Sequence, residues 1–176
     1  MSDRSAVLNV SVVVGNPKPG SRTLGVANAI AEAVVSGLKV TAGLLVVDLA
    51  EYAGEIFDPN SEALRKLTDS VASSDLLIVA SPTFKASYTG LLKSFFDRYG
   101  SNALAGVVAI PVMTGAAPVH TLALEVHLRP LLTELGASTP SQGLYVTESQ
   151  FPNLDAIVRR WASEATPRIS ASVPVR

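Results

Sequence analysis

The hydrophobic positions of the chain form two kinds of segment that alternate from one end to the other. Val7–Val14 is apolar on both faces of a pleated strand, which is typical of strands buried on both sides in a parallel sheet. Leu24–Val35 instead carries its apolar residues at the spacing of a helix with one buried face. The pattern predicts strands at Val7–Val14, Val40–Leu49, Leu76–Ala80, Val107–Val112 and Gly143–Thr147. It predicts helices at Leu24–Val35, Ser61–Ala72, Thr89–Tyr99, Val119–Leu135 and Asn153–Glu164.

Small and polar residues mark the ends of these elements. Ser36-Gly37 is expected to stop the first helix, and Gly100 to stop the third. Ser61 and Asn153 are suited to cap the helices that follow them. The tail from Thr166 onward contains Ser, Ala and Pro, and we expect it to fray.

This alternation of strands and helices indicates an α/β fold with helices on both faces of a parallel sheet. Five strands favour the flavodoxin-like order 2-1-3-4-5, a three-layer sandwich. No internal linker or repeat divides residues 1–176, so we expect a single domain. This strand order places a ligand at the carboxyl ends of strands 1, 3 and 4. The loops there are Gly15–Thr23, Ser81–Ser87 and Thr114–Pro118.

Composition and charge remove several classes of function. The chain has 176 residues and a net charge of −1, which gives no electrostatic case for nucleic acid or an anionic membrane as partner. No apolar run approaches the roughly 18–20 residues of a membrane-spanning helix, and a secretory signal pattern is missing, so we expect a cytoplasmic protein. The sequence has no cysteine, and His120 and His127 are too few for a histidine-rich metal site. We therefore expect no metal.

The loop Gly15–Thr23 has the composition of an anion site. A helix that begins at Ser21 would present free backbone N–H groups and its positive dipole end to a phosphate. The polar and cationic side chains of the loop are Asn16, Lys18, Ser21, Arg22 and Thr23. The loop matches neither the Walker A pattern, because Ser21-Arg22 replaces Lys-Ser/Thr, nor the dinucleotide pattern G-x-G-x-x-G. A terminal phosphomonoester is the favoured ligand, and a tight turn with solvated cations is the alternative.

The other two loops suit a planar ring. Phe84 can stack on or flank a heterocycle, whereas in the alternative interpretation Phe84 and Tyr88 cover the core and Lys85 lies on the surface. The third loop, Thr114–Pro118, consists of small residues that allow close backbone approach. His120 follows it and could line the site or be merely structural.

Three segments together resemble the NAD(P)H-dependent FMN reductases. Gly15–Thr23 resembles their phosphate loop, G-S-P-R-x-x-S-R-S/T, and Ser81–Lys93 resembles their segment S/T-P-x-Y-x-x-S-x-x-G-x-L-K. Thr114-Gly115, followed by His120 and the segment Leu128–Leu132, is similar to the branch that supplies reduced flavin to alkanesulfonate monooxygenases.

The resemblance implies FMN as the flavin and NADPH or NADH as the hydride donor. It implies phosphate contacts from Asn16, Lys18, Ser21, Arg22 and Thr23. It implies ring contacts from Pro82, Thr83, Phe84, Lys85 and Ser87 on one side and from Thr114, Gly115 and Ala116 on the other. Asn16 replaces the usual Ser or Thr, and Phe84 replaces a common Tyr, so one phenol hydrogen bond is missing. The alkanesulfonate branch often inserts a Tyr into the helix after the third loop, but Leu124–Leu128 has none.

The implied reaction is hydride transfer from the nicotinamide to N5 of the flavin, for which the protein supplies stacking, orientation and a polar environment. Lys85 is the candidate catalytic residue, because its charge could stabilise the anionic reduced flavin. A reductase with tightly held FMN that acts on quinones, azo dyes or chromate is an alternative, as is an electron-transfer flavodoxin. The expected partners are flavin, pyridine nucleotide and a flavin-dependent monooxygenase.

Two helices are richer in apolar residues than one buried stripe requires. Thr89–Tyr99 contains Leu91, Leu92, Phe95 and Phe96, and Val119–Leu135 is rich in Leu. The surplus predicts a homodimer or homotetramer in which these helices meet a second copy. His127 could take part in that interface or be a surface residue.

Overall fold

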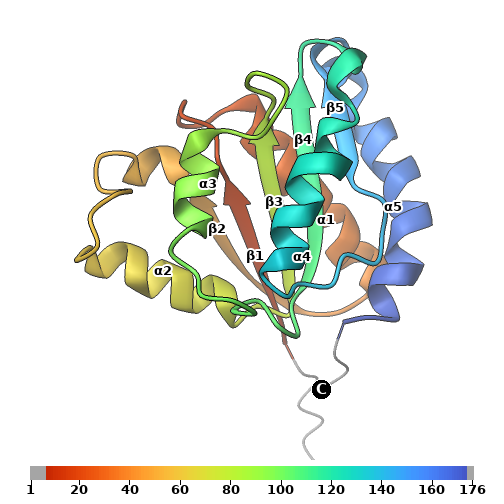
Figure 1. Cartoon of the computed structure of the whole chain (residues 1–176). Helices are drawn as coiled ribbons and strands as arrows, with labels where there is room; N and C mark the ends of the chain where they lie inside the picture. The colour runs from red at the N-terminus through yellow and green to blue at the C-terminus, as the bar shows by residue number, and fades with distance from the viewer. Residues whose placement is uncertain (1–6, 174–176) are drawn as a thin grey trace, which may run out of the picture.

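The computed structural model describes residues 7–173, which form one five-stranded sheet between two layers of helices (Figure 1). All neighbouring strands are parallel, and their order is β2-β1-β3-β4-β5. Helices α1 and α5 cover one face of the sheet, and α2, α3 and α4 cover the other. The predicted flavodoxin-like fold class and strand order are therefore confirmed.

The strands are β1 (Leu8–Val14), β2 (Ala42–Asp48), β3 (Leu76–Pro82), β4 (Val108–Gly115) and β5 (Leu144–Thr147). Val12 and Val13 point to opposite faces of β1, and both are fully buried, as expected for a strand with helices on either side. Two strands extend further than predicted, because Pro82 and Thr114 still pair across β3 and β4. Pro82 lacks a backbone N–H, and as the last residue of β3 it deprives the sheet of a hydrogen bond only at the end of the strand.

The helices are α1 (Arg22–Leu38), α2 (Glu62–Ala72), α3 (Gly90–Phe96), α4 (Arg129–Glu134) and α5 (Leu154–Ser170). Ser21, Ser61 and Thr89 cap α1, α2 and α3, each with a side-chain oxygen that accepts a backbone N–H of the first turn. The predicted cap at Ser61 is confirmed. Asn153 precedes α5, but its side chain makes no capping hydrogen bond. In residues 7–173, none of the helices has the length and apolar character needed to cross a bilayer.

Two helices run past the ends predicted for them, and one contact explains both corrections. α1 continues through Ser36-Gly37 to Leu38 and ends where Lys39 adopts a left-handed conformation, φ 57°. α5 continues past Glu164 to Ser170, so the segment expected to fray from Thr166 is still helical there. Gly37 and Thr166 are packed so closely that a Cβ on Gly37 would lie 3.1 Å from the Thr166 methyl group. Gly37 therefore serves helix packing and does not stop α1.

The predicted helix Val119–Leu135 is divided into three pieces. A short 3-10 turn, η2 (Pro118–His120), is followed by a π-helical segment, η3 (Leu124–Leu128), and then by α4. The extra residue of a π segment widens the turn, and such segments are often found at functional sites. The chain therefore has the local widening of its helix without the tyrosine that often accompanies it in the resembling branch.

Candidate functional site

The three predicted ligand loops lie together at one edge of the sheet, toward which the strand arrows point in Figure 1. β1 pairs with β3, and β3 pairs with β4, so the loops that follow these strands are neighbours. Backbone hydrogen bonds continue past the strands: Gly15 N–H donates to the Ala80 carbonyl at 2.9 Å, and Thr83 N–H donates to the Thr114 carbonyl at 2.7 Å.

The first loop is shaped by hydrogen bonds that leave its outer side open. The Asn16 side chain accepts the Lys18 N–H at 3.0 Å and donates to the Thr23 hydroxyl at 3.2 Å. Gly20 adopts φ +61°, which favours glycine, and no atom lies within 4 Å of the position that its Cβ would take. The Gly20 N–H donates to a buried carboxylate, Asp48 Oδ2, at 2.9 Å. Sequence reasoning missed Asp48, although a polar residue at the carboxyl end of a strand was a signal for it.

The polar residues at the start of α1 have different surroundings. Ser21 is buried, and its hydroxyl accepts the Leu24 N–H at 3.3 Å. Thr23 is also buried, and its hydroxyl shares a 2.8 Å hydrogen bond with that of Thr114. Thr23 therefore links the first and third loops, while Lys18 on the exposed part of the loop is accessible. These residues surround the N–H groups of the first turn of α1.

The Arg22 side chain contacts the segment that follows β5. Its guanidinium Nη2 lies 2.9 Å from Glu148 Oε1, and its Cζ lies 4.9 Å from the centroid of the Phe151 ring. Both partners belong to the 3-10 segment η4 (Glu148–Asn153), which follows β5. Sequence reasoning missed Glu148 because β5 was not expected to contribute to the site.

The second loop is fastened to the first through α3. The Thr89 hydroxyl donates to the Gly15 carbonyl and accepts the Leu92 N–H, while the Thr89 N–H donates to the buried Ser81 hydroxyl at 3.0 Å. Gly15 leaves no space for a side chain, since its Cβ would lie 2.4 Å from Leu92 Cβ. The glycine at the end of β1 is therefore required by the close approach of α3.

The tip of the second loop is a tight turn made without glycine. Phe84 and Ser87 exchange backbone hydrogen bonds of 2.8 and 3.1 Å, and between them Lys85 and Ala86 adopt φ 50° and 65°. Two consecutive residues with positive φ form the kind of turn that usually contains Asn-Gly, so this turn is strained. Phe84 is 52% exposed, and Lys85 is exposed. The alternative interpretation therefore holds only in part: Phe84 does not cover the core, whereas Tyr88 packs against it and Lys85 lies on the surface.

Tyr145 of β5 links the second and third loops through its hydroxyl group. Its hydroxyl accepts the Thr83 hydroxyl at 3.2 Å and donates to the Ala117 carbonyl at 3.3 Å. A Cβ on Gly115 would lie only 2.0 Å from Tyr145 Oη, so this glycine is fixed by the tyrosine beneath it. Sequence reasoning missed Tyr145, because its position depends on the register Met113↔Tyr145.

The remaining candidates divide between the ends of two strands and the surface around the third loop. Thr114 and Gly115 are the last residues of β4, and Pro82 is the last residue of β3, so these three belong to the sheet. Ala116, His120 and His127 are exposed. His127 lies in η3, and His120 ends η2.

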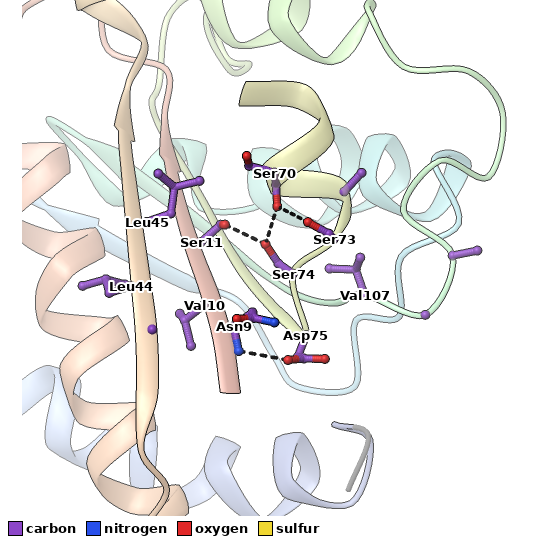
Figure 2. A pocket seen from close by; sticks show the side chains of 14 residues that line it. Asn9, Val10, Ser11, Leu44, Leu45, Ser70, Ser73, Ser74, Asp75 and Val107 are labelled. Carbon is purple, nitrogen blue, oxygen red and sulfur yellow. Dashed lines mark hydrogen bonds between the residues drawn. The ribbon is translucent and has the colours of Figure 1, made fainter. Parts of the chain in front are cut away.

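A cavity of about 760 Å³ lies at the opposite, amino-terminal edge of the sheet (Figure 2). Several of its polar groups are already hydrogen-bonded: the Ser11 and Ser74 hydroxyls are 2.6 Å apart, Ser73 donates to the Ser70 carbonyl, and the Asn9 N–H donates to Asp75. Size alone therefore does not mark the functional edge. The concentration of loop cations, helix N–H groups and an exposed aromatic ring does so.

Comparisons of the sequence with known proteins point to one family. The family model described as NADPH-dependent FMN reductase matches residues 8–151. The chain is 34% identical over 168 residues to "FMN reductase (NADPH)" of Pseudomonas aeruginosa, with 90% of each chain covered. It is 34% identical over 151 residues to "NADH-dependent FMN reductase SfnF" of Pseudomonas putida, with 84% of this chain and 81% of the relative covered.

A solved structure gives the same result in three dimensions. An apo form of the NADH:FMN oxidoreductase EMOB superposes with a TM-score of 0.84 and 28% identity, covering 97% of this chain and 92% of the other. Sequence and fold thus match the same group of proteins over nearly the whole chain. The protein belongs to the NADPH-dependent FMN reductase family.

Proposed function

We propose that this protein is an NAD(P)H-dependent FMN reductase. The observation that carries the proposal is the meeting, at one edge of the sheet, of a cationic loop at a helix N-terminus and a loop with an exposed aromatic ring. Family membership supports it, and relatives that share about a third of their residues with this chain are named FMN reductases. These names favour this activity over an electron-transfer flavodoxin or a reductase of quinones, azo dyes or chromate.

The first loop fits a flavin phosphate. Its backbone N–H groups at the start of α1 carry the positive end of the helix dipole, and Lys18 supplies an accessible positive charge. The space beside Gly20 is open, so a phosphate could approach the backbone closely. Asn16, Ser21 and Thr23 would then hold the loop in shape through their mutual and capping hydrogen bonds.

The second and third loops fit the flavin ring. Phe84 exposes an aromatic face beside Pro82 and Thr83, and Ala116 is exposed on the neighbouring loop. Tyr145 fixes the spacing of these two loops from beneath. We infer that Pro82, Thr83, Phe84, Lys85 and Ser87 contact the ring from one side and that Thr114, Gly115, Ala116 and His120 complete the site from the other.

When bound, FMN supplies a ring that accepts hydride from the nicotinamide, and the protein needs no general acid or base for that step. The protein's residues would orient the ring and hold the phosphate at the same edge of the sheet.

Lys85 is the proposed catalytic residue, since an ammonium group beside the ring loop would stabilise negative charge that develops there. Lys85→Ala should then lower kcat while the free energy of unfolding stays within about 0.5 kcal/mol of the wild type. Unchanged turnover and unchanged FMN affinity would remove Lys85 from the mechanism.

The function is tested by steady-state oxidation of NADH and NADPH with FMN, FAD or riboflavin as acceptor. We expect pyridine-nucleotide oxidation that depends on added flavin and is fastest with FMN, because only the phosphate of FMN fits the first loop as a terminal group. A purified protein without absorbance near 450 nm would identify FMN as a substrate, whereas a yellow protein with ping-pong kinetics toward quinones would favour the alternative. No flavin-dependent oxidation with either nucleotide would refute the proposal.

A flavin-dependent monooxygenase that takes up reduced FMN is the proposed partner, and a cytoplasmic location remains a prediction from the sequence.

We also propose a homodimer or homotetramer. Tyr88, Val126 and Leu131 line a groove of about 470 Å³ between α3 and the segment η3–α4, and Val126 is exposed. A monomeric mass by light scattering at micromolar concentration would contradict this assembly.

A further inference from the structure

Arg22 is held by the connection between β5 and α5, although its sequence position belongs to the first loop. The ion pair with Glu148 spans 126 positions of the sequence, and both side chains are more than half exposed, at 65% and 53%. Glu148 directly follows Thr147, which pairs with Gly115 at the same edge of the sheet. The guanidinium that the first loop would offer to a phosphate is therefore paired with a carboxylate of η4, the segment that directly follows β5.

The charges around the first loop are balanced within the described residues. The loop contains two cations, Lys18 and Arg22. Two carboxylates contact it, Asp48 through the Gly20 N–H and Glu148 through Arg22. Two positive and two negative charges cancel, so a dianionic phosphate gains little from the net charge of the loop. Attraction beyond that of Lys18 and the N-terminus of α1 therefore depends on whether Arg22 can leave Glu148.

We propose that Glu148 is a positioning residue that competes with the flavin phosphate for Arg22. Entry of the phosphate exchanges the Arg22–Glu148 ion pair for an Arg22–phosphate pair, and departure of the phosphate restores the first pair. Phe151 keeps the guanidinium within reach of Glu148 by stacking under it. The inference rests on the FMN reductase function proposed above and deepens it, because the exchange makes FMN a ligand that leaves readily.

The competition between Glu148 and the phosphate should weaken the affinity for FMN by a modest factor, because other groups of the loop also contribute to binding. An exposed ion pair of this kind shifts an equilibrium by only about two- to fivefold, and removing the nearby negative charge adds to the effect on a dianion. A neutral side chain at position 148 should therefore strengthen binding of FMN. It should leave riboflavin nearly unaffected, because riboflavin carries the same ring without the phosphate.

The test compares flavin affinities of the full-length protein by quenching of flavin fluorescence. Glu148→Gln should lower the Kd for FMN roughly three- to tenfold and change that for riboflavin less than about twofold. The FMN gain should shrink as salt is raised, because exposed charges are screened. In an Arg22→Gln background the gain from Glu148→Gln should disappear. Asp155→Asn, which removes the same charge from an exposed position in the first turn of α5, serves as the matched control and should leave both affinities unchanged.

Several outcomes would overturn the proposal. Equal changes for FMN and riboflavin would indicate a structural effect on the loops. An unchanged FMN Kd, or a gain that survives in the Arg22→Gln background, would show that Glu148 does not compete for Arg22. A wild-type protein that binds neither flavin would refute the FMN reductase function itself, and the competition with it.

Discussion

Single side chains at the sheet edge determine how closely the loops approach one another. Tyr145 is the clearest case, because its hydroxyl contacts both ring loops and lies directly beneath Gly115. The tyrosine is not itself a proposed ligand contact. Tyr145 instead fixes the distance between the second and third loops. Substitutions at Tyr145 and at Gly115 can therefore test this positioning role apart from direct ligand binding.

Gly115→Ala should damage this arrangement. The new methyl group would lie 2.0 Å from Tyr145 Oη, and forcing an extra methyl into a packed site costs about 1–3 kcal/mol. We expect the free energy of unfolding to fall by that amount in urea titrations, together with weaker FMN binding. Tyr145→Phe removes the clashing oxygen, so the double variant should recover part of both losses. A Gly115→Ala protein with wild-type stability and affinity would contradict the predicted contact.

The strained turn at Lys85-Ala86 should be stabilised by a substitution to glycine, whereas Gly115→Ala should destabilise the protein. Ala86 has φ 65°, a conformation that costs an L-residue about 1–2 kcal/mol and that glycine adopts freely. Ala86→Gly should therefore raise the free energy of unfolding by roughly 0.5–1 kcal/mol after the greater freedom of glycine in the unfolded chain is subtracted. Ala33→Gly in the interior of α1 is the matched control, and it should lower stability by about 1 kcal/mol. A loss of stability at both positions would show that the turn is not strained.

Sequence patterns were sufficient for residues whose role depends on local order. Ser21 and Ser61 could be assigned as helix starts because a cap precedes its helix directly. Glu148 and Tyr145 could not be placed, because their partners lie far away in sequence and are brought close only by the register of β4 and β5. Phe84 could be named, but its exposure depends on the turn that follows it.

Among the elements, the segment η3 shows how an irregular helix is stabilised by charge. Arg129, the first residue of α4, binds both carboxylate oxygens of Glu125 and also donates to the carbonyls of Thr139 and Ser141, each at 3.1 Å. The π segment is thereby tied to the chain that leads into β5. The Arg129 guanidinium holds the pKa of Glu125 below its usual value, although partial burial opposes this shift.

Glu125→Gln should reveal this pair through pH. A carboxyl whose pKa is lowered by folding stabilises the protein above its unfolded pKa, near 4.5, and this stabilisation is lost as pH falls through the lower folded pKa. At pH 7 we expect the variant to be less stable by about 1 kcal/mol, since the pair is bidentate but partly exposed. The difference should shrink below pH 4.5.

Glu62→Gln on α2 breaks a fully surface pair with Lys66 and provides the control. It should have a smaller effect at every pH, measured by thermal unfolding. A stability difference for Glu125→Gln that stays constant from pH 7 to pH 3 would show that the charge of Glu125 is not responsible.

The widened turn at η3 could not be derived from hydrophobic spacing. A π segment of five residues changes the face of only a few side chains, so the Leu-rich stretch still has the period of one continuous helix. The ends of α1 and α5 were also predicted too early, because Gly37 and Thr166 acquire their role only when the two helices meet. Strand order was easier, since alternating strands and helices admit few arrangements.

At the scale of the whole molecule, the C-terminal helix is part of the core. Ile169 has no exposed surface and belongs to the hydrophobic cluster between the sheet and the layer of α1 and α5. The predicted loss of order from Thr166 would have left this cluster open at its end. The described chain instead closes it as far as Ser170.

Ile169→Ala tests this closure. Removing a fully buried isoleucine should lower the free energy of unfolding by about 2–4 kcal/mol in urea titrations. Arg168→Ala, at the exposed neighbouring position, should change it by less than about 0.5 kcal/mol. If both variants matched the wild type, the last turns of α5 would contribute nothing to the fold.

The contact between Gly15 and Leu92 has a consequence for recombination between relatives. The end of β1 and the first turns of α3 touch without space for a methyl group, and the Thr89 hydroxyl bridges them. Residues 15–23 and 81–93 are therefore expected to be compatible only when both come from the same protein, even though about sixty residues separate them. A chimera that takes both segments from the same parent keeps a matched pair of surfaces, whereas one that mixes parents joins surfaces that were never selected together.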